Sequence, residues 1–262
     1  MISLSESEEP FLLHQIVADL HTHSVCTSHA YQTVNEMAAG AKEKGLCALA
    51  ITDHGPAMPD APHSWHFGNW NVLPRVVSGV AMLYGAEANV MDIFGGLDLP
   101  QCTLEKMDWV IASIHSPCLP GNLTRKEADR LWRAVAENPL VDCIGHSEQE
   151  CYRYDYDSLT KVFARNQKVV ELNGHSFICR KDGIPNLRAL IKACYNSGCR
   201  IALDGDAHSV GTLGENADLL WNMLDEIGFP EELVINAGRE NLVKELTLHR
   251  KNCAAEIGGI IL

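Results

Sequence analysis

The chain has 262 residues, of which 46% are hydrophobic and 21% are charged, so its composition is that of a folded globular protein and not of a disordered or fibrous one. Its 34 acidic and 21 basic side chains leave a formal net charge of −13, which disfavours a long nucleic acid as the main partner. The 12 histidines are many for a chain of this length, and histidine is the commonest protein ligand for metal ions.

Short apolar runs alternate with helix-like segments along almost the whole chain, which predicts repeated βα units around a parallel sheet. Capping-box patterns at Thr33 with Glu36 and at Thr124 with Glu127 predict helices that end near Gly45 and Asn138. Further helices are expected at 157–166, 185–196, 214–227 and 238–250. The strands are expected near 16–20, 46–52, 80–86, 109–114, 141–145, 168–172 and 200–204.

Two connections depart from this alternation. Gly95-Gly96 is typical of a hairpin turn. The segment 55–75, rich in Pro, His, Trp and Asn, is expected to be a long functional loop without regular structure. The fold class that follows is α/β, a distorted (β/α)7 TIM-like barrel. We expect a single domain over residues 1–262, with 1–15 as a flexible N-terminal extension.

The ten cysteines do not indicate a disulfide framework. The first ten residues are acidic and polar where a secretory signal is basic and then apolar, and no cysteine pair has C-x-x-C spacing. No apolar run reaches the ~18 residues that span a bilayer. We therefore expect reduced thiols and a soluble, cytoplasmic protein without a membrane partner.

Metal-binding side chains follow the predicted strands at their carboxyl ends. In a barrel of parallel strands these ends meet at one mouth, where such proteins place their chemistry. The spacing of these residues also supports metal binding. Alternate residues of an extended segment share a face, so His21 and His23 would point to the same side, as would Asp206 and His208. The pattern predicts a polynuclear metal site at the strand C-termini. The residues concerned are His21, His23, His54, Glu87, His115, His146, Asp206 and His208.

These motifs resemble the polymerase and histidinol phosphatase (PHP) superfamily. His21-Thr-His23, Thr52-Asp-His54-Gly55, Gly85-Ala-Glu87-Ala-Asn89, Ala112-Ser-Ile-His115, Gly145-His146 and Asp204-Gly-Asp206-Ala-His208 occur in the family's order. Thr27-Ser-His29-Ala-Tyr31 and the segment 53–69 are most similar to its YcdX-like branch of bacterial phosphoesterases. The resemblance extends from about residue 16 to residue 245.

The resemblance implies three divalent ions, usually zinc, although manganese and iron also suit these ligands. His21, His23, Glu87 and Asp206 would hold the first ion. Glu87 would bridge to a second, held by His115 and His146, and the third would be held by His29, His54 and His208. Two departures from the family, at Ser147-Glu148 and at Gly174-His175, affect the pocket wall and hence the choice of substrate.

The predicted function is a metal-dependent phosphatase that hydrolyses a small phosphomonoester by attack of a metal-bound hydroxide at a trinuclear cluster. Three alternatives remain open. The first is phosphodiesterase or nuclease activity on small nucleotides. The second is amide hydrolysis, disfavoured because no strand end offers an obvious lysine. The third is a metal-binding protein without catalysis.

Other residues are candidates of second rank. His63 and His66 on the 55–75 loop, and Arg180 with Lys181 after the sixth strand, are candidates for substrate contact or acid catalysis, against local structural roles. Asp53 either orients a metal ligand or caps a turn, and His175 either reaches the pocket or is structural. Packing is expected for Trp65, Trp70 and Trp109, and a surface position for His14 and His249.

Overall fold

The structure is a computed structural model that describes residues 15–262. The extension expected over residues 1–15 therefore lies outside the described residues except for Gln15. Seven strands begin and end within three residues of their expected positions. They are β1 (Ala18–Thr22), β2 (Ala48–Ile51), β4 (Val80–Asn89), β5 (Trp109–Ser113), β6 (Cys143–Ile144), β7 (Val169–Asn173) and β8 (Ile201–Asp204).

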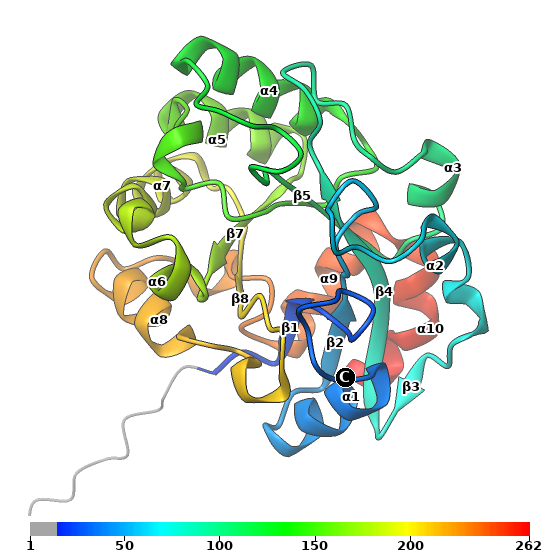
Figure 1. Cartoon of the computed structure of the whole chain (residues 1–262). Helices are drawn as coiled ribbons and strands as arrows, with labels where there is room; N and C mark the ends of the chain where they lie inside the picture. The colour runs from blue at the N-terminus through cyan, green and yellow to red at the C-terminus, as the bar shows by residue number, and fades with distance from the viewer. Residues whose placement is uncertain (1–14) are drawn as a thin grey trace, which may run out of the picture.

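These strands are parallel and pair in the order β1-β2-β4-β5-β6-β7-β8, and a short β3 (Val76–Val77) runs antiparallel to β4. Figure 1 shows them as a ring at the centre of the molecule with helices around it. The expected α/β, distorted seven-stranded barrel is confirmed.

Both predicted capping boxes are present, so Thr33 and Thr124 begin the first two long helices as expected. None of the described helices is long and apolar enough to span a bilayer. The helices that match the sequence pattern are α1 (Val34–Glu43), α4 (Arg125–Glu137), α5 (Tyr156–Arg165), α7 (Ile184–Ser197), α8 (Ala217–Asp225) and α9 (Arg239–His249). Those that the pattern missed are α2 (Ser64–Gly68), α3 (Gln101–Leu104), α6 (Ser176–Cys179) and α10 (Lys251–Ile261). Short 3₁₀ turns lie at Trp70–Val72, Glu150–Tyr152, Lys181–Gly183, Val210–Thr212 and Glu231–Leu233.

Two of the expected connections differ in the structure. The 55–75 segment is not an irregular loop, since it contains α2 and the turn Trp70–Val72, and it buries Phe67 and Trp70 in the core. The turn at Gly95 is present, with φ of +78°. The two segments that it connects form only a single antiparallel bridge, between Val90 and Leu97, and not two full strands.

The inward faces of the strands change from apolar to polar along their length. Successive side chains of a strand point to opposite faces, so Leu83 and Glu87 of β4 lie on the same face. In the same way, Ile111 of β5 shares a face with His115, which lies just beyond the end of that strand. Leu83 and Ile111 belong to an apolar cluster that also takes Ile257 of α10. The interior of the barrel is therefore filled with apolar side chains toward the N-terminal ends of these strands, and Glu87 and His115 lie toward the other end.

The gap between the first and last strands is closed mainly by side chains. One backbone bridge lies at its carboxyl end, where Ala207 N–H donates to His21 O at 3.1 Å and His23 N–H donates to Ala207 O at 2.9 Å. Leu203 of β8 donates its N–H to Asn236 Oδ1 at 3.0 Å, while Asn236 Nδ2 donates to Leu203 O at 2.7 Å and to Ala18 O of β1 at 2.9 Å. Leu20 N–H donates to Asp204 Oδ1 at 2.9 Å, and the N–H groups of Gly205 and Gly214 donate to Asp19. Buried side-chain oxygens and amides thus replace the missing ladder between β1 and β8.

Replacing Asn236 by alanine should weaken this seam. The buried N–H and C=O of Leu203 and the C=O of Ala18 would lose their partner, and each unpaired buried group costs about 1–3 kcal/mol. Urea unfolding should show a loss of roughly 2–5 kcal/mol for Asn236→Ala. Asn222→Ala, on the exposed face of α8, should stay within about 0.5 kcal/mol of the parent. Equal losses for the two variants would contradict this account of the seam.

A charged network joins α9 to the N-terminal end of the barrel. His249 was expected at the surface, but its side chain is only 7% exposed, with Nδ1 3.4 Å from Asp142 Oδ1 and Nε2 3.0 Å from Glu245 Oε1. Arg250 contacts Asp142 at 2.8 Å, and Arg200 contacts Glu245 at 2.6 Å. The expectation was wrong because this side of α9 faces buried carboxylates. His14 lies outside the described residues.

This network makes part of the stability depend on pH. Burial alone would lower the pKa of His249, but the hydrogen bonds and charges of Asp142 and Glu245 raise it to about 9. Because the pKa of His249 is higher in the folded than in the unfolded state, protonated His249 stabilises the fold. This stabilisation is complete at pH values below the unfolded pKa of about 6.5 and is lost as the pH rises above about 9. At about 1.4 kcal/mol per pKa unit, His249→Gln should lower the unfolding free energy by on the order of 2–3 kcal/mol at pH 6 and by much less at pH 10.

Chemical unfolding across this pH range provides the measurement. The effect of His249→Gln should also shrink in a Glu245→Gln background, because the two groups share one interaction. A pH-independent difference between parent and variant would rule out the ion pairs as its cause.

Candidate metal centre

The structure brings all nine predicted metal-binding side chains together at the carboxyl ends of the strands. His21 belongs to β1, with His23 and His29 following it, and Glu87 belongs to β4. The other five lie just beyond strand ends: His54 after β2, His115 after β5, His146 after β6, and Asp206 with His208 after β8. Residues from opposite ends of the sequence thus share one mouth.

The carboxylate of Glu87 lies at the centre of this group and is fully buried. Its Oε1 is 2.8 Å from His146 Nε2 and 3.2 Å from His115 Nε2. Its Oε2 is 3.0 Å from His54 Nδ1 and 3.3 Å from His21 Nε2. The two oxygens therefore face two different sets of imidazoles, which is the geometry of a bridging carboxylate.

Asp206 lies on the other side of the first-strand histidines. Its Oδ1 is 3.2 Å from His23 Nε2 and 3.6 Å from His21 Nε2. Asp206 has φ of +53° and His146 has φ of +24°. Left-handed backbone is unfavourable for residues with a Cβ, and such residues concentrate at functional sites.

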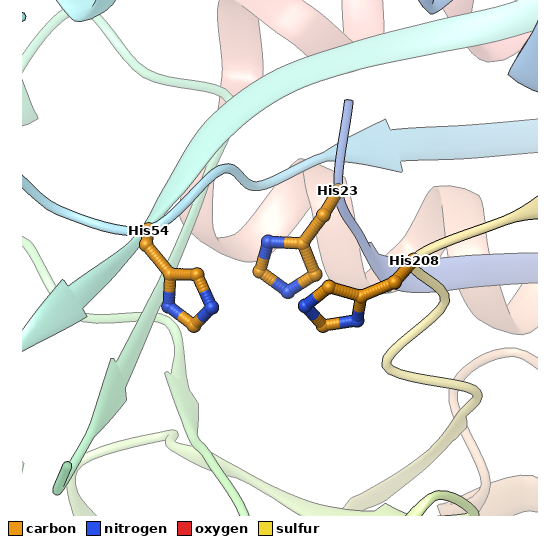
Figure 2. A group of neighbouring side chains, drawn as sticks. All are labelled: His23, His54 and His208. Atoms are coloured by element: carbon orange, nitrogen blue, oxygen red, sulfur yellow. The ribbon is translucent and has the colours of Figure 1, made fainter. Parts of the chain in front are cut away.

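The outer part of the cluster is a group of imidazoles. Figure 2 shows the rings of His23, His54 and His208 converging from three separate segments. The ring of His23 is 4.5 Å from that of His54 and 4.2 Å from that of His208. His29 adds an exposed ring 4.3 Å from His208.

Several buried polar atoms in this cluster lie close to one another but make no hydrogen bond of good geometry among the described residues. Leaving such atoms unpaired is costly, and so nearly all buried polar groups in proteins are satisfied. Cations held between these side chains would bind the lone pairs of the carboxylate and of one nitrogen in each ring, and imidazole with carboxylate suits zinc, manganese or iron. The residues present therefore fit a metal centre. The unpaired atoms are His21 Nε2, both ring nitrogens of His23, His54 Nδ1, Glu87 Oε2 and His208 Nε2.

The pKa directions of Glu87, His23 and His146 agree with this fit. Burial would lower the pKa values of His21 and His54, but carboxylates beside them, Glu171 and Glu87 for His21 and Glu87 for His54, raise them. Burial would raise the pKa of Glu87, but the surrounding His115, His21 and His54 hold it well below its ordinary value. Burial lowers the pKa of His23 to about 3, with neighbouring imidazoles adding to the effect. Burial and then Arg180 lower the pKa of His146 to about 4. A deprotonated carboxylate and neutral imidazoles are the forms that bind metal.

A second set of side chains holds the imidazoles in place. Glu171 Oε1 lies 2.5 Å from His21 Nδ1, and its Oε2 accepts the N–H of His146 at 2.6 Å. Asn89 Oδ1 lies 2.7 Å from His115 Nδ1, and Asp60 lies 2.5 Å from His29 Nδ1. Sequence reasoning missed Glu171, although a lone acidic residue inside an apolar strand was the available signal.

Asp53 is fully buried and fixes the loop after β1. Its carboxylate accepts from the N–H and Oγ of Ser24, at 2.7 Å each, and from Thr27 Oγ1 at 3.0 Å. It also lies 2.9 Å from His66 Nε2. Asp53 was expected either to orient a metal ligand or to cap a turn. In the structure it caps a turn, and that turn leads to His29.

The second-rank candidates are placed differently from one another. His63 is exposed and, as the N-cap of α2, accepts a hydrogen bond from the N–H of Trp65. Trp65 was expected to pack against other residues, but it is 81% exposed. Lys181 is exposed. Trp70 and Trp109 are buried, as expected. His66 is held by Asp53. Arg180 reaches the cluster, because its Nη2 donates to Asp206 Oδ2 at 3.1 Å.

The chain is thus a seven-stranded α/β barrel with a cluster of His and carboxylate side chains that could hold metal ions at the carboxyl ends of its strands. The PHP domain family model matches residues 19–176. The chain is 42% identical to a probable phosphatase of Clostridium novyi over 88% of this chain and 94% of the relative. It is 39% identical to a probable phosphatase of Acetivibrio thermocellus over 86% and 93% of the respective lengths.

The chain therefore belongs to the PHP family. Its fold is also similar to a crystal structure of histidinol phosphate phosphatase from Lactococcus lactis, complexed with zinc, L-histidinol and phosphate. That similarity has a TM-score of 0.56 and 15% identity, and it covers 81% of this chain and 94% of the other. At this identity the likeness supports the fold alone.

Proposed function

We propose that this protein is a metal-dependent phosphatase that hydrolyses a small phosphomonoester at a centre of three divalent ions. The observation that carries the proposal is the set of buried, unpaired nitrogen and oxygen atoms around Glu87. The names of the curated relatives support phosphate-ester chemistry, and the His and carboxylate donor set supports zinc, with manganese or iron as alternatives.

The ligand assignment follows the two faces of Glu87. His21, His23 and Asp206 would hold the first ion on the side of Oε2, and His115 with His146 would hold the second on the side of Oε1. His29, His54 and His208 would hold the third. His54 Nδ1 lies 3.0 Å from Glu87 Oε2, so this side chain would also be close to the first ion. Structural zinc sites are usually closed and rich in thiolates, so this donor set supports a catalytic role.

When bound, such ions polarise phosphate oxygens and lower the pKa of a bound water. Arg180 would add a fixed positive charge beside them. Burial would lower the pKa of its guanidinium, but Asp206 and Glu148 raise it, so Arg180 stays protonated. Its Nη1 also lies within 3.4 Å of Asn173 Oδ1 and 3.2 Å of Ser176 Oγ. These contacts fix the guanidinium beside the cluster, where its positive charge would attract a phosphate group.

Phosphate release tests the proposal directly. Purified protein loaded with zinc or manganese should release phosphate from p-nitrophenyl phosphate faster than it cleaves bis(p-nitrophenyl) phosphate. Chelation followed by dialysis should reduce the rate at least ~100-fold, and His115→Ala should lower kcat by a similar factor. Faster cleavage of the diester would favour the phosphodiesterase alternative. Bound metal without turnover on either ester would favour a binding protein.

Glu171→Gln tests whether the imidazoles are positioned for metal. The amide cannot hold His21 Nδ1–H as a carboxylate does, and loss of such a partner weakens metal affinity by roughly 10–100-fold. Competition with a chromogenic chelator measures this without any substrate. Asp157→Asn, an exposed carboxylate in the first turn of α5, is the matched control and should bind metal like the parent. Unchanged affinity in Glu171→Gln would contradict the assignment of His21.

A further inference from the structure

A pocket of about 270 Å³ adjoins the cluster on the side of the outermost imidazoles. At ~30 Å³ per water-sized group, it has room for roughly nine non-hydrogen atoms. One wall is formed by His29, Asp206 and His208, which are proposed metal ligands. The other wall consists of Tyr31, His175, Ser209 and Thr212. A phosphate bound at the ions would thus leave its organic part beside this second wall.

His175 is held in this wall by a carboxylate. Its Nδ1 lies 2.9 Å from Glu215 Oε2, and its ring is 6.3 Å from that of His208. His175 lines the pocket and Glu215 does not, so the carboxylate holds the imidazole from outside the pocket, and Cys179 also contacts the His175 side chain. The side chain of His175 remains 31% exposed, and it is therefore available to a ligand.

The backbone around His175 requires its glycine neighbour. A Cβ on Gly174 would lie 1.7 Å from the carbonyl oxygen of Glu215, so only glycine lets the two segments approach. Asn216 Nδ2 donates to Gly174 O at 2.9 Å and locks the same contact. Figure 1 shows α6 and α8, which follow these segments, next to one another. Gly174 and His175 act together, because the glycine brings Glu215 within reach of the imidazole.

The chemistry of this second wall selects among phosphate esters. It offers an imidazole edge, hydroxyl groups and an aromatic ring that is 74% exposed. None of the residues that line the pocket is Lys or Arg, the side chains that usually hold a second phosphate or a carboxylate. A hydroxyl group suits His175 in either protonation state, since it donates to a neutral Nε2 and accepts from Nε2–H.

We propose that His175, held by Glu215, is a specificity-determining residue that binds a hydroxyl group of a polyhydroxylated phosphomonoester, such as a sugar phosphate or polyol phosphate, with Tyr31 packing against its carbon skeleton. This inference rests on the proposed phosphatase function and adds the class of the alcohol.

Two esters with five-carbon primary alcohols test the proposal: ribose 5-phosphate and n-pentyl phosphate, which lacks hydroxyl groups. The parent enzyme should show a kcat/KM at least ~10-fold higher for ribose 5-phosphate. His175→Ala should lower that value by roughly 10–100-fold and change the value for n-pentyl phosphate less than about 3-fold, because sites built to bind a hydroxyl reject substrates without it. Glu215→Gln should show the same selective loss at a smaller size.

Surface aromatic residues supply the matched control for Tyr31. Tyr31→Ala should lower kcat/KM for ribose 5-phosphate by roughly 3–10-fold, whereas Tyr195→Ala, an exposed tyrosine on α7, should leave it unchanged. Bound metal should be the same in all these variants, which shows that the cluster is intact. If His175→Ala is poorly folded, Glu215→Gln and Tyr31→Ala make the same comparison.

Three results would overturn the inference while leaving the phosphatase proposal in place. One is equal loss on both esters in His175→Ala. Another is no preference of the parent for ribose 5-phosphate. The third is a preference for esters with a second phosphate that depends on His175, which would assign an anion to this wall. Absence of phosphate release from every ester, p-nitrophenyl phosphate included, would overturn both proposals.

Discussion

The hydrogen bonds that join the first strand to the last are the constraint on which the whole site depends. Asn236, Asp19 and Asp204 carry out most of this closure with side chains, because β1 and β8 have no regular ladder between them. At the carboxyl end of the seam, the backbone of Ala207 bonds to His21 and His23. Together these bonds hold the proposed metal ligands His23 and Asp206 3.2 Å apart. A seam that opened would separate the two halves of the cluster before any ligand itself was changed.

The charge of the chain has a different meaning once the cluster is considered. The formal net charge is −13, and three divalent ions would add six positive charges, which leaves −7. The added charge would be confined to one mouth, where Arg180 is already present. An acidic surface around a cationic pocket admits a small phosphate ester and repels a long polyanion. Composition alone suggested only the second of these properties.

Most of the fold and the residues of the cluster were predictable from sequence because strand-end positions converge in a parallel barrel. The capping boxes at Thr33 and Thr124 and the seven apolar runs are local signals that tertiary packing did not override. Partners distant in sequence were not predictable. Glu171 meets His21 across 150 positions, and Asn236 meets Ala18 across 218. The buried position of His249 depends on Asp142 and Glu245 in the same way. The sequence showed only that it lies away from the strand ends, and its expected surface position was therefore wrong.

The seam between β1 and β8 also sets the order in which this chain can mature as it is synthesised. Leu20 must wait for Asp204, 184 positions later, and Ala18 must wait for Asn236. Until then one edge of the first strand has exposed backbone groups, and such edges associate readily with other chains. Contacts of this sequence separation also slow folding. On this edge the first strand therefore stays unpaired until residues 204–236 have been synthesised.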